Sequence, residues 1–116
     1  MAKSSYFYVL FCNDGTLYGG YTTDLDRRTE EHNSGTGAKY TRPARRRPVK
    51  MLYAEEYATR SEATKAEAAF KRLTRKNKDR FLKERGVSLP FRKDAERIVQ
   101  CMIEEEIVDE EPAKLQ

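Results

Sequence analysis

A helix predicted over residues 24–34 carries polar side chains where an apolar stripe would normally lie. Leu25 begins that stripe, and helical periodicity continues it through positions 28, 29 and 32. Those positions hold Arg28, Thr29 and His32. Arg28 and His32 are four residues apart, so they share one face, and Leu25 turns that face towards the sheet. We therefore expect both side chains to line a site, although a solvated helix with an incidental arginine gives the same pattern.

A second predicted helix holds a carboxylate within its apolar stripe. The stripe is formed by Ala63, Ala66, Phe70 and Leu73. Glu67 lies four residues after Ala63, inside this stripe. Burying an isolated carboxylate costs on the order of several kcal/mol, so Glu67 must pair with a cation. That cation is either a metal ion or, in a purely structural ion pair, Arg28 or Lys71.

Two tyrosines lie on predicted strands joined by a short turn. A two-residue turn would put Tyr8 and Tyr18 on opposite faces, whereas a three-residue turn over residues 13–15 pairs Tyr8 with Gly20 and puts both tyrosines on one face. The order Asn-Asp-Gly favours the longer form, a type I turn followed by a left-handed glycine. We therefore expect the tyrosines to be diagonal neighbours, with open space beside them at Gly20.

The five candidate residues together suit hydrolysis of a phosphodiester bond. The set is Tyr8, Tyr18, Arg28, His32 and Glu67. A glutamate can hold one Mg²⁺ (or Mn²⁺) with water in most other positions, and a metal-bound water loses its proton more easily. Arginine stabilises the charge that grows on a phosphoryl group. A tyrosine, with a pKa near ~10, becomes a base at neutral pH only when cations such as Arg28 and the metal lower that pKa.

The elements that position these residues predict an α+β fold. The expected strands cover residues 5–12, 16–21 and 49–57, and the expected helices cover residues 24–34 and 59–85. The second helix breaks near Thr74 and stops at Gly86. We expect residues 1–86 to form one domain, a small three-stranded antiparallel sheet flanked by helices. Residues 87–116 are expected to add a helical extension from Ser88 onward, with an acidic and partly disordered tail.

The charge of the chain is unevenly distributed along its 116 residues. Residues 1–85 hold 19 Lys/Arg and 11 Asp/Glu, a net charge of +8, whereas residues 86–116 hold 4 and 8, a net charge of −4. A basic body favours a polyanionic partner, although a highly charged solvated surface gives the same count. The acidic tail is a candidate contact for a protein partner.

A basic loop over residues 37–47 is the expected contact for nucleic-acid phosphates. Its candidate residues are Lys39, Tyr40, Arg42, Arg45, Arg46 and Arg47. Lysine and arginine bind phosphates, and Tyr40 can stack on an exposed base. Backbone contacts carry no sequence code, so we expect structure-selective or weakly sequence-specific binding with steep salt dependence.

Several classes of protein are excluded by composition. Two cysteines, distant in sequence, and one histidine argue against a disulfide framework and against a multi-histidine metal site. The sequence has no apolar run long enough to cross a membrane and no signal peptide, so we expect a cytoplasmic protein without a membrane partner. Nothing in the sequence indicates an oligomeric state.

The ordered motifs resemble the GIY-YIG endonuclease superfamily, and above all its short stand-alone bacterial members. The resemblance covers about residues 5–85, with the first motif at residues 6–8 (Tyr-Phe-Tyr) and the second at residues 18–20 (Tyr-Gly-Gly). The family's arginine falls on Arg28, its histidine-or-tyrosine position on His32 and its metal-binding glutamate on Glu67. The sequence departs from the family at Tyr6, where the first motif has glycine, and at Gly19.

The resemblance implies a metal-dependent endonuclease that cleaves nucleic acid, most simply DNA in repair or recombination, with one Mg²⁺ or Mn²⁺. In that scheme Tyr18 or a tyrosine-coupled water is the base, and Tyr8 orients the water or the phosphate. Arg28 steadies the transition state, and Glu67 holds the metal. The alternative is a nucleic-acid-binding module that keeps the nuclease fold but has little catalysis of its own.

Overall fold

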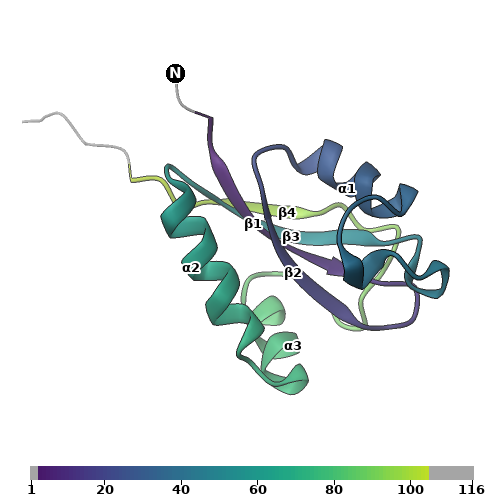
Figure 1. Ribbon diagram of the computed structural model, residues 1–116. Coiled ribbons are helices and arrows are strands. Elements are labelled where there is room, and N and C mark those ends of the chain that lie inside the picture. Colours follow the sequence, from purple (N-terminus) through teal and green to yellow (C-terminus); the bar gives the residue numbers. More distant parts are fainter. Residues whose placement is uncertain (1–2, 105–116) are drawn as a thin grey trace, which may run out of the picture.

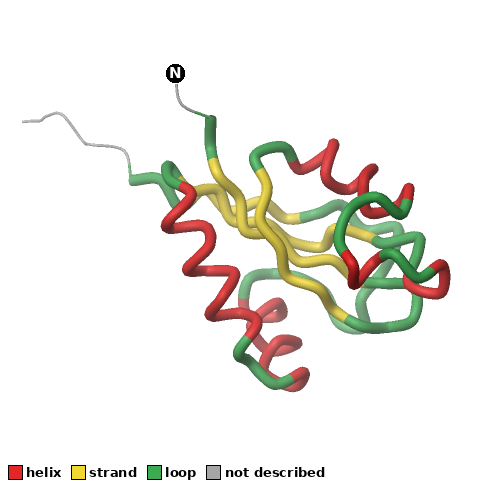
Figure 2. The backbone as a smooth tube through the Cα atoms, in the orientation of Figure 1, coloured by secondary structure: helices red, strands yellow, loops and turns green. Residues whose placement is uncertain are grey.

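A mixed four-stranded sheet forms the centre of the protein, with helices on both faces (Figures 1 and 2). In the computed structural model, which describes residues 3–104, the chain order is β1 (Ser5–Phe11), β2 (Leu17–Thr22), α1 (Leu25–Ser34), η1 (Lys39–Thr41), η2 (Ala44–Arg46), β3 (Lys50–Tyr57), α2 (Arg60–Lys71), α3 (Arg75–Glu84) and β4 (Ile98–Cys101). The spatial order of the strands is β2-β1-β3-β4. None of the helices in this part of the chain is long and apolar enough to cross a membrane.

The β1–β2 hairpin has the register predicted from its three-residue turn. The amide of Cys12 donates to the carbonyl of Thr16 at 2.8 Å, and Gly15, at φ +87°, donates to the carbonyl of Cys12 at 2.9 Å. This left-handed φ explains why glycine closes the turn. Tyr8 is consequently paired with Gly20, as expected.

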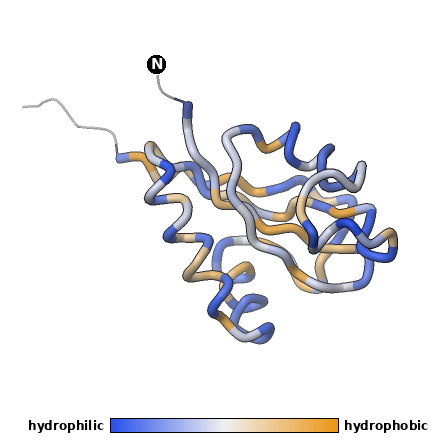
Figure 3. Tube along the Cα trace, viewed as in Figure 1, coloured by the Kyte–Doolittle hydropathy of each residue, from blue (hydrophilic) through white to orange (hydrophobic). Residues whose placement is uncertain are grey.

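Alternation along β1 divides the core between the two faces of the sheet. Phe7 and Val9 face the layer of α2 and α3, where they belong to one apolar cluster with Phe70 and Leu82. Tyr8 and Leu10 point to the other face, into a second cluster that includes Leu25 of α1. Figure 3 shows the contrast between the more apolar strands and the largely hydrophilic α1. Helix α1 is therefore placed against the sheet with little apolar surface.

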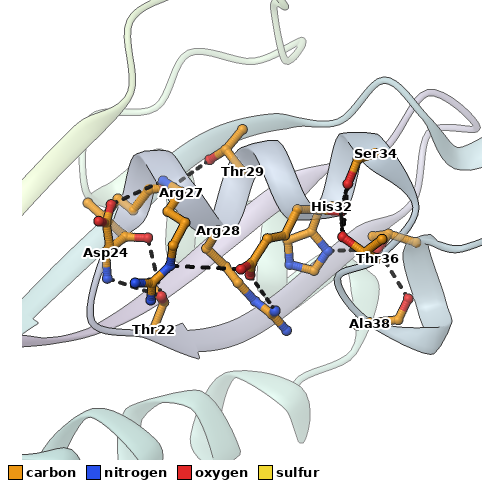
Figure 4. Close-up of polar contacts among 12 residues, drawn as sticks. Thr22, Asp24, Arg27, Arg28, Thr29, His32, Ser34, Thr36 and Ala38 are labelled. Atoms are coloured by element: carbon orange, nitrogen blue, oxygen red, sulfur yellow. Dashed lines mark hydrogen bonds and ion pairs between the residues drawn. The ribbon is translucent and has the colours of Figure 1, made fainter.

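The boundaries of α1 follow from its capping residues. The Asp24 carboxylate accepts a hydrogen bond from the amide of Arg27 at 3.0 Å, which identifies Asp24 as the N-cap (Figure 4). Gly35, at φ +85°, ends the helix in the left-handed conformation. The ten-residue helix so defined agrees with the range predicted from the sequence.

The observed sheet corrects the prediction of three antiparallel strands. A fourth strand, β4, runs parallel to β3, with Ile98 opposite Tyr53. The helix predicted from Ser88 onward is therefore wrong over the described residues. Its apolar spacing suits a helix, but the free edge of β3 supplies backbone partners, and β-branched Ile98 and Val99 suit a strand. The acidic remainder of the expected extension, residues 105–116, lies outside the described residues.

Two helices and a long segment make the connection that a parallel pair of strands requires. Helix α2 begins with a capping box, in which Thr59 and Glu62 exchange hydrogen bonds, and α3 begins at the N-cap Thr74, where a break was predicted. After α3, Gly86 has φ +98° and the next residue, Val87, is buried in the core. The centre of the Phe91 ring then lies 5.2 Å from the centre of the Phe11 ring.

Leu82 should be the residue that attaches α3 to the sheet. Its side chain is fully buried, so Leu82→Ala should lower the free energy of unfolding by ~2–5 kcal/mol. Leu89→Ala is the matched control, since Leu89 is 43% exposed, and it should change stability by less than ~0.5 kcal/mol. Urea unfolding followed by circular dichroism measures both, and equal effects would contradict this packing of α3.

Candidate active site

A chain of hydrogen bonds connects β1, α1 and η1 through three buried side chains. The Tyr8 hydroxyl lies 2.7 Å from Nε2 of His32, and Nδ1 of His32 lies 2.7 Å from the Thr41 hydroxyl. The Thr41 hydroxyl donates in turn to the carbonyl of Ala38 at 3.3 Å. With that proton in use, Nδ1–H of His32 donates to Thr41, and Nε2 accepts from Tyr8. Every polar side-chain group in this chain of hydrogen bonds therefore has a partner.

His32 is held as a neutral ring. Its side chain is fully buried, and burial, followed by the nearby charge of Arg28, lowers the pKa of His32 to about 4. At neutral pH its Nε2 is consequently free of a proton and accepts the hydrogen bond of Tyr8. His32 thus fixes the direction of the Tyr8 hydroxyl rather than carrying a charge.

Arg28 reaches the same hydroxyl from one turn earlier in α1. Its Nε donates to the Tyr8 hydroxyl at 3.3 Å, and its Nη1 donates to the carboxylate of Glu31 at 2.9 Å. Figure 4 shows Arg28 and His32 along α1. The orientation predicted for both residues agrees with these contacts. The Arg28 side chain is 26% exposed, so part of it stays accessible from solvent.

Arg28 does not lower the pKa of Tyr8 below its ordinary value, contrary to the expectation from the sequence. Burial raises the pKa of Tyr8 to about 12, and Arg28 opposes this shift without reversing it. At neutral pH the Tyr8 hydroxyl therefore keeps its proton. A buried phenol of this kind is a hydrogen-bond donor at neutral pH.

Two glycines make the room for this buried network. A Cβ on Gly20 would lie 2.4 Å from the Tyr8 hydroxyl oxygen, and a Cβ on Gly37 would lie 2.7 Å from Nδ1 of His32. The open space expected at Gly20 is thus filled by the end of the Tyr8 side chain itself. Gly37 and Thr41 were not predicted as site residues, because they lie in a loop where no periodicity reveals which side chains turn inward.

Tyr18 lies beside this network with a more accessible ring. The centre of its ring lies 5.5 Å from that of the His32 ring, edge to face. It also stacks on Tyr40, with the ring centres 5.4 Å apart and the ring planes at 21°. None of the described residues forms a hydrogen bond with its hydroxyl, whereas that of Tyr8 has two partners. The guanidinium of Arg46 lies 3.9 Å from the centre of the Tyr40 ring. Tyr40, proposed from the sequence to stack on a base, is thus already engaged by the protein.

Glu67 approaches the tyrosines from the last turn of α2. Its carboxylate forms an ion pair with Lys71 at 2.9 Å, one of the two partners weighed from the sequence, and is 19% exposed. The Lys71 ammonium lies 5.4 Å from the centre of the Tyr18 ring, which places this pair beside Tyr18. Glu67 also contributes to the raised pKa of Tyr8. The carboxylate is therefore near both tyrosines, although α2 packs against the other face of the sheet.

The donor set around Glu67 is compatible with one hard cation. Within residues 3–104, no three His, Cys, Asp or Glu side chains are grouped so that they could hold a metal. Glu67 would thus be a single carboxylate ligand, and Mg²⁺ is commonly held by one or two carboxylates, with water and phosphate oxygens as further ligands. Lys71 is half exposed, so a cation can replace it at the carboxylate.

The basic loop divides into residues that brace it and residues that face solvent. Arg46 bonds to Asp14 at 3.1 Å, and Arg47 donates to the carbonyls of Asn33 and Arg42. Arg42 and Arg45 are exposed, as is Lys39, and their side chains form no ion pair with any described residue. The accessible cations of this loop are therefore Lys39, Arg42 and Arg45.

Comparison with known proteins places the chain in a family. The GIY-YIG catalytic domain matches residues 4–80. A UPF0213 protein of Enterococcus faecalis is 70% identical over 81 residues, which make up 70% of this chain and 92% of that relative. A UPF0213 protein of Listeria welshimeri is 62% identical over 87 residues, 73% of this chain and 94% of the relative. A solution NMR structure of an E. faecalis protein, 66% identical, has a TM-score of 0.52 and covers 75% of this chain and 91% of that chain.

The burial of His32 predicts that the stability of the protein depends on pH. The pKa responsible can be measured on the ring of this one residue. The pKa is about 6.5 in an unfolded chain and about 4 in the folded one, so the unfolded state binds the proton first. The contribution to stability is complete above about pH 6.5 and falls as the pH decreases towards 4. NMR titration of the ring of His32, the only histidine in the chain, should give a midpoint near 4 when a purification tag without histidine is used.

His32→Asn is the comparison for this prediction. Between about pH 7 and pH 5, the wild type should lose more free energy of unfolding than the variant in urea titrations. A ring that titrates near the ordinary value of ~6.5 would show that His32 is not held as described.

Gly20→Ala should displace the Tyr8 hydroxyl from His32. The new Cβ would lie 2.4 Å from that oxygen, so overpacking should cost ~1–3 kcal/mol of stability. The same substitution in a Tyr8→Leu background should cost less, because the opposing ring atoms are gone. Urea unfolding of the four proteins gives the coupling energy, and strictly additive costs would contradict the contact.

Proposed function

The chain belongs to the GIY-YIG catalytic domain family, and on that premise we propose that it is a metal-dependent endonuclease that hydrolyses phosphodiester bonds in DNA. The observation that carries this proposal is the half-buried Arg28, held at the Tyr8 hydroxyl beside Tyr18, whose hydroxyl has no hydrogen-bond partner among residues 3–104. A guanidinium fixed on two sides by protein groups is preorganised to receive an anion. Residue-level roles follow from burial and from the partners that each group already has.

Arg28 is the proposed contact for the scissile phosphate. Its bonds to Tyr8 and Glu31 use two of its donors, so the remaining N–H groups are free to donate to phosphate oxygens. Because these donors are positioned before the substrate arrives, they stabilise the charge that develops in the transition state without reorganisation.

The two tyrosines are proposed to have different roles. The Tyr18 hydroxyl has no partner among the described residues, so it can bind and orient the attacking water. To take the proton of that water it must act as a phenolate, after its own proton has passed to solvent. The Tyr8 hydroxyl is buried and points at His32, which makes Tyr8 and His32 positioning residues for Arg28. This division supports the role assigned to Tyr18 from the family resemblance.

Glu67 would hold a single Mg²⁺ or Mn²⁺, which when bound supplies positive charge beside the phosphate. The carboxylate is presented by α2 and lies 2.9 Å from the Lys71 ammonium, the position that the cation would take. Lys71 itself then becomes available to the substrate backbone, next to Tyr18.

DNA substrates of irregular structure, such as those of repair and recombination, are the proposed targets. The exposed cations Lys39, Arg42 and Arg45 contact phosphates and read no base. Binding to this surface is therefore selective for shape, or only weakly selective for sequence, and is sensitive to salt.

A nucleic-acid-binding module with little catalysis is the second candidate. The Glu67–Lys71 ion pair favours it, because a lysine four residues away satisfies the carboxylate without any metal. In that case the Tyr8–His32–Thr41 chain would serve only to attach α1 to the sheet.

Loss of the Glu67 charge distinguishes the two candidates. The wild type should cut supercoiled plasmid, flaps or branched junctions at low salt with Mg²⁺ or Mn²⁺. Glu67→Gln should cut at least ~100-fold more slowly and still bind the same DNA. Glu84→Gln is the control, since this exposed carboxylate lies at the end of α3, and it should retain full activity. The measurement is the initial rate of product formation on a gel.

One result would reject the nuclease proposal, and another would reject the role of Glu67 within it. One is salt-sensitive binding without cleavage of any substrate by the wild type, which would favour the binding module. The other is unchanged cleavage by Glu67→Gln, which would leave Glu67 as a structural partner of Lys71.

A further inference from the structure

Helix α3 presents a row of cations that the proposed site does not use. Lys76, Arg80 and Lys83 lie at positions i, i+4 and i+7, so they share one face of the helix, and all three are exposed. The opposite face packs on the core, where Phe81 lies 5.4 Å from the Phe70 ring. Arg72, at the C-cap of α2, is a further exposed cation shortly before α3 in the sequence. We name these four residues the α3 row.

The α3 row differs from its neighbours in forming no ion pair with any residue between 3 and 104. Arg75 pairs with Asp79 at 2.9 Å, and Lys71 pairs with Glu67 at the same distance. Among residues 3–104, no acidic side chain lies within ion-pair distance of any member of the row. A concentration of like charge without counter-charges raises the local positive potential and attracts a polyanion.

The hairpin turn connects the α3 row to the basic loop. Arg75, in the first turn of α3, donates to the carbonyl of Gly15 at 2.7 Å. Asp14, the residue before Gly15 in the same turn, forms an ion pair with Arg46 of η2 at 3.1 Å. The loop and α3 therefore flank the turn of residues 13–15. The row also begins directly after the Glu67–Lys71 pair, at the end of α2.

We propose that the α3 row is a second nucleic-acid surface, which binds the sugar-phosphate backbone of a duplex that continues from the cleavage site. The inference rests on the proposed function for the identity of the partner. Along the helix, residues 76–83 extend over ~10 Å. This length corresponds to about three phosphates of one strand, at ~3.4 Å of duplex axis each. Contacts from lysine and arginine to backbone phosphates carry no sequence information, so this contact is independent of sequence.

The test removes three charges from the row and compares an equally charged control. The test variant is Lys76→Gln/Arg80→Gln/Lys83→Gln. The control is Lys3→Gln/Arg60→Gln/Lys65→Gln, whose exposed positions lie before β1 and on α2. Both variants have the same net charge, and thermal unfolding verifies that both are folded. The probe is a fluorescent duplex of about 30 base pairs, with the matched single strand, in EDTA at several KCl concentrations.

The row variant should bind the duplex more weakly than the wild type. The slope of log K against log[KCl] should become shallower by about 2–3, because ~0.9 is lost for each phosphate contact removed. The control variant should keep the wild-type slope. Equal slopes for the two variants, or a loss confined to the single strand, would overturn the proposal. Tighter binding by the row variant would also overturn it.

Cleavage assays separate this inference from the proposed function. If the wild type cuts DNA and the row variant retains the wild-type slope, the α3 surface is rejected while the nuclease stands. If the wild type never cuts but the row variant has the shallower slope, the nuclease is rejected while the α3 surface stands.

Discussion

The hydrogen bond between the Tyr8 hydroxyl and His32 is the interaction on which the candidate site depends. It lies in a region closed to solvent, where an unpaired polar group would cost ~1–3 kcal/mol. Helix α1 has only Leu25 and His32 as buried residues, so this polar contact replaces the apolar stripe that usually attaches a helix. The same contact sets the place of Arg28, which shares the Tyr8 hydroxyl.

The residues that make space for Tyr8 and His32 also determine the protonation of these two side chains. Gly20 lets the end of Tyr8 reach the helix, and Gly37 lets the loop pass over His32. Closure of this loop excludes water, which keeps His32 neutral and Tyr8 protonated. Tyr18 and Glu67, to which we assign the reaction in the proposed function, lie nearer the surface. The arrangement therefore places a buried hydrogen-bonded support behind more accessible candidate groups.

Sequence reasoning was accurate where structure is local. The turn chemistry at residues 13–15 determined the register of Tyr8 and Gly20, and spacing along α1 indicated the face of Arg28 and His32. It failed for β4, because a four-residue parallel strand exists only through its long-range pairing with β3. It also gave no sign of Thr41, since the inward turn of a loop residue is set by tertiary contacts. The dominance of burial over Arg28 at Tyr8 likewise depends on packing that a sequence does not display.

The hairpin turn has a consequence for how this protein can evolve. Tips of hairpins usually accept inserted residues, because few contacts hold them. Here the turn is joined to Arg46 on one side and to Arg75 on the other. One inserted residue would also shift the strand register and carry Tyr18 to the opposite face of the sheet. Turn length is thus expected to be fixed among functional descendants, while variation in length accumulates elsewhere in the chain.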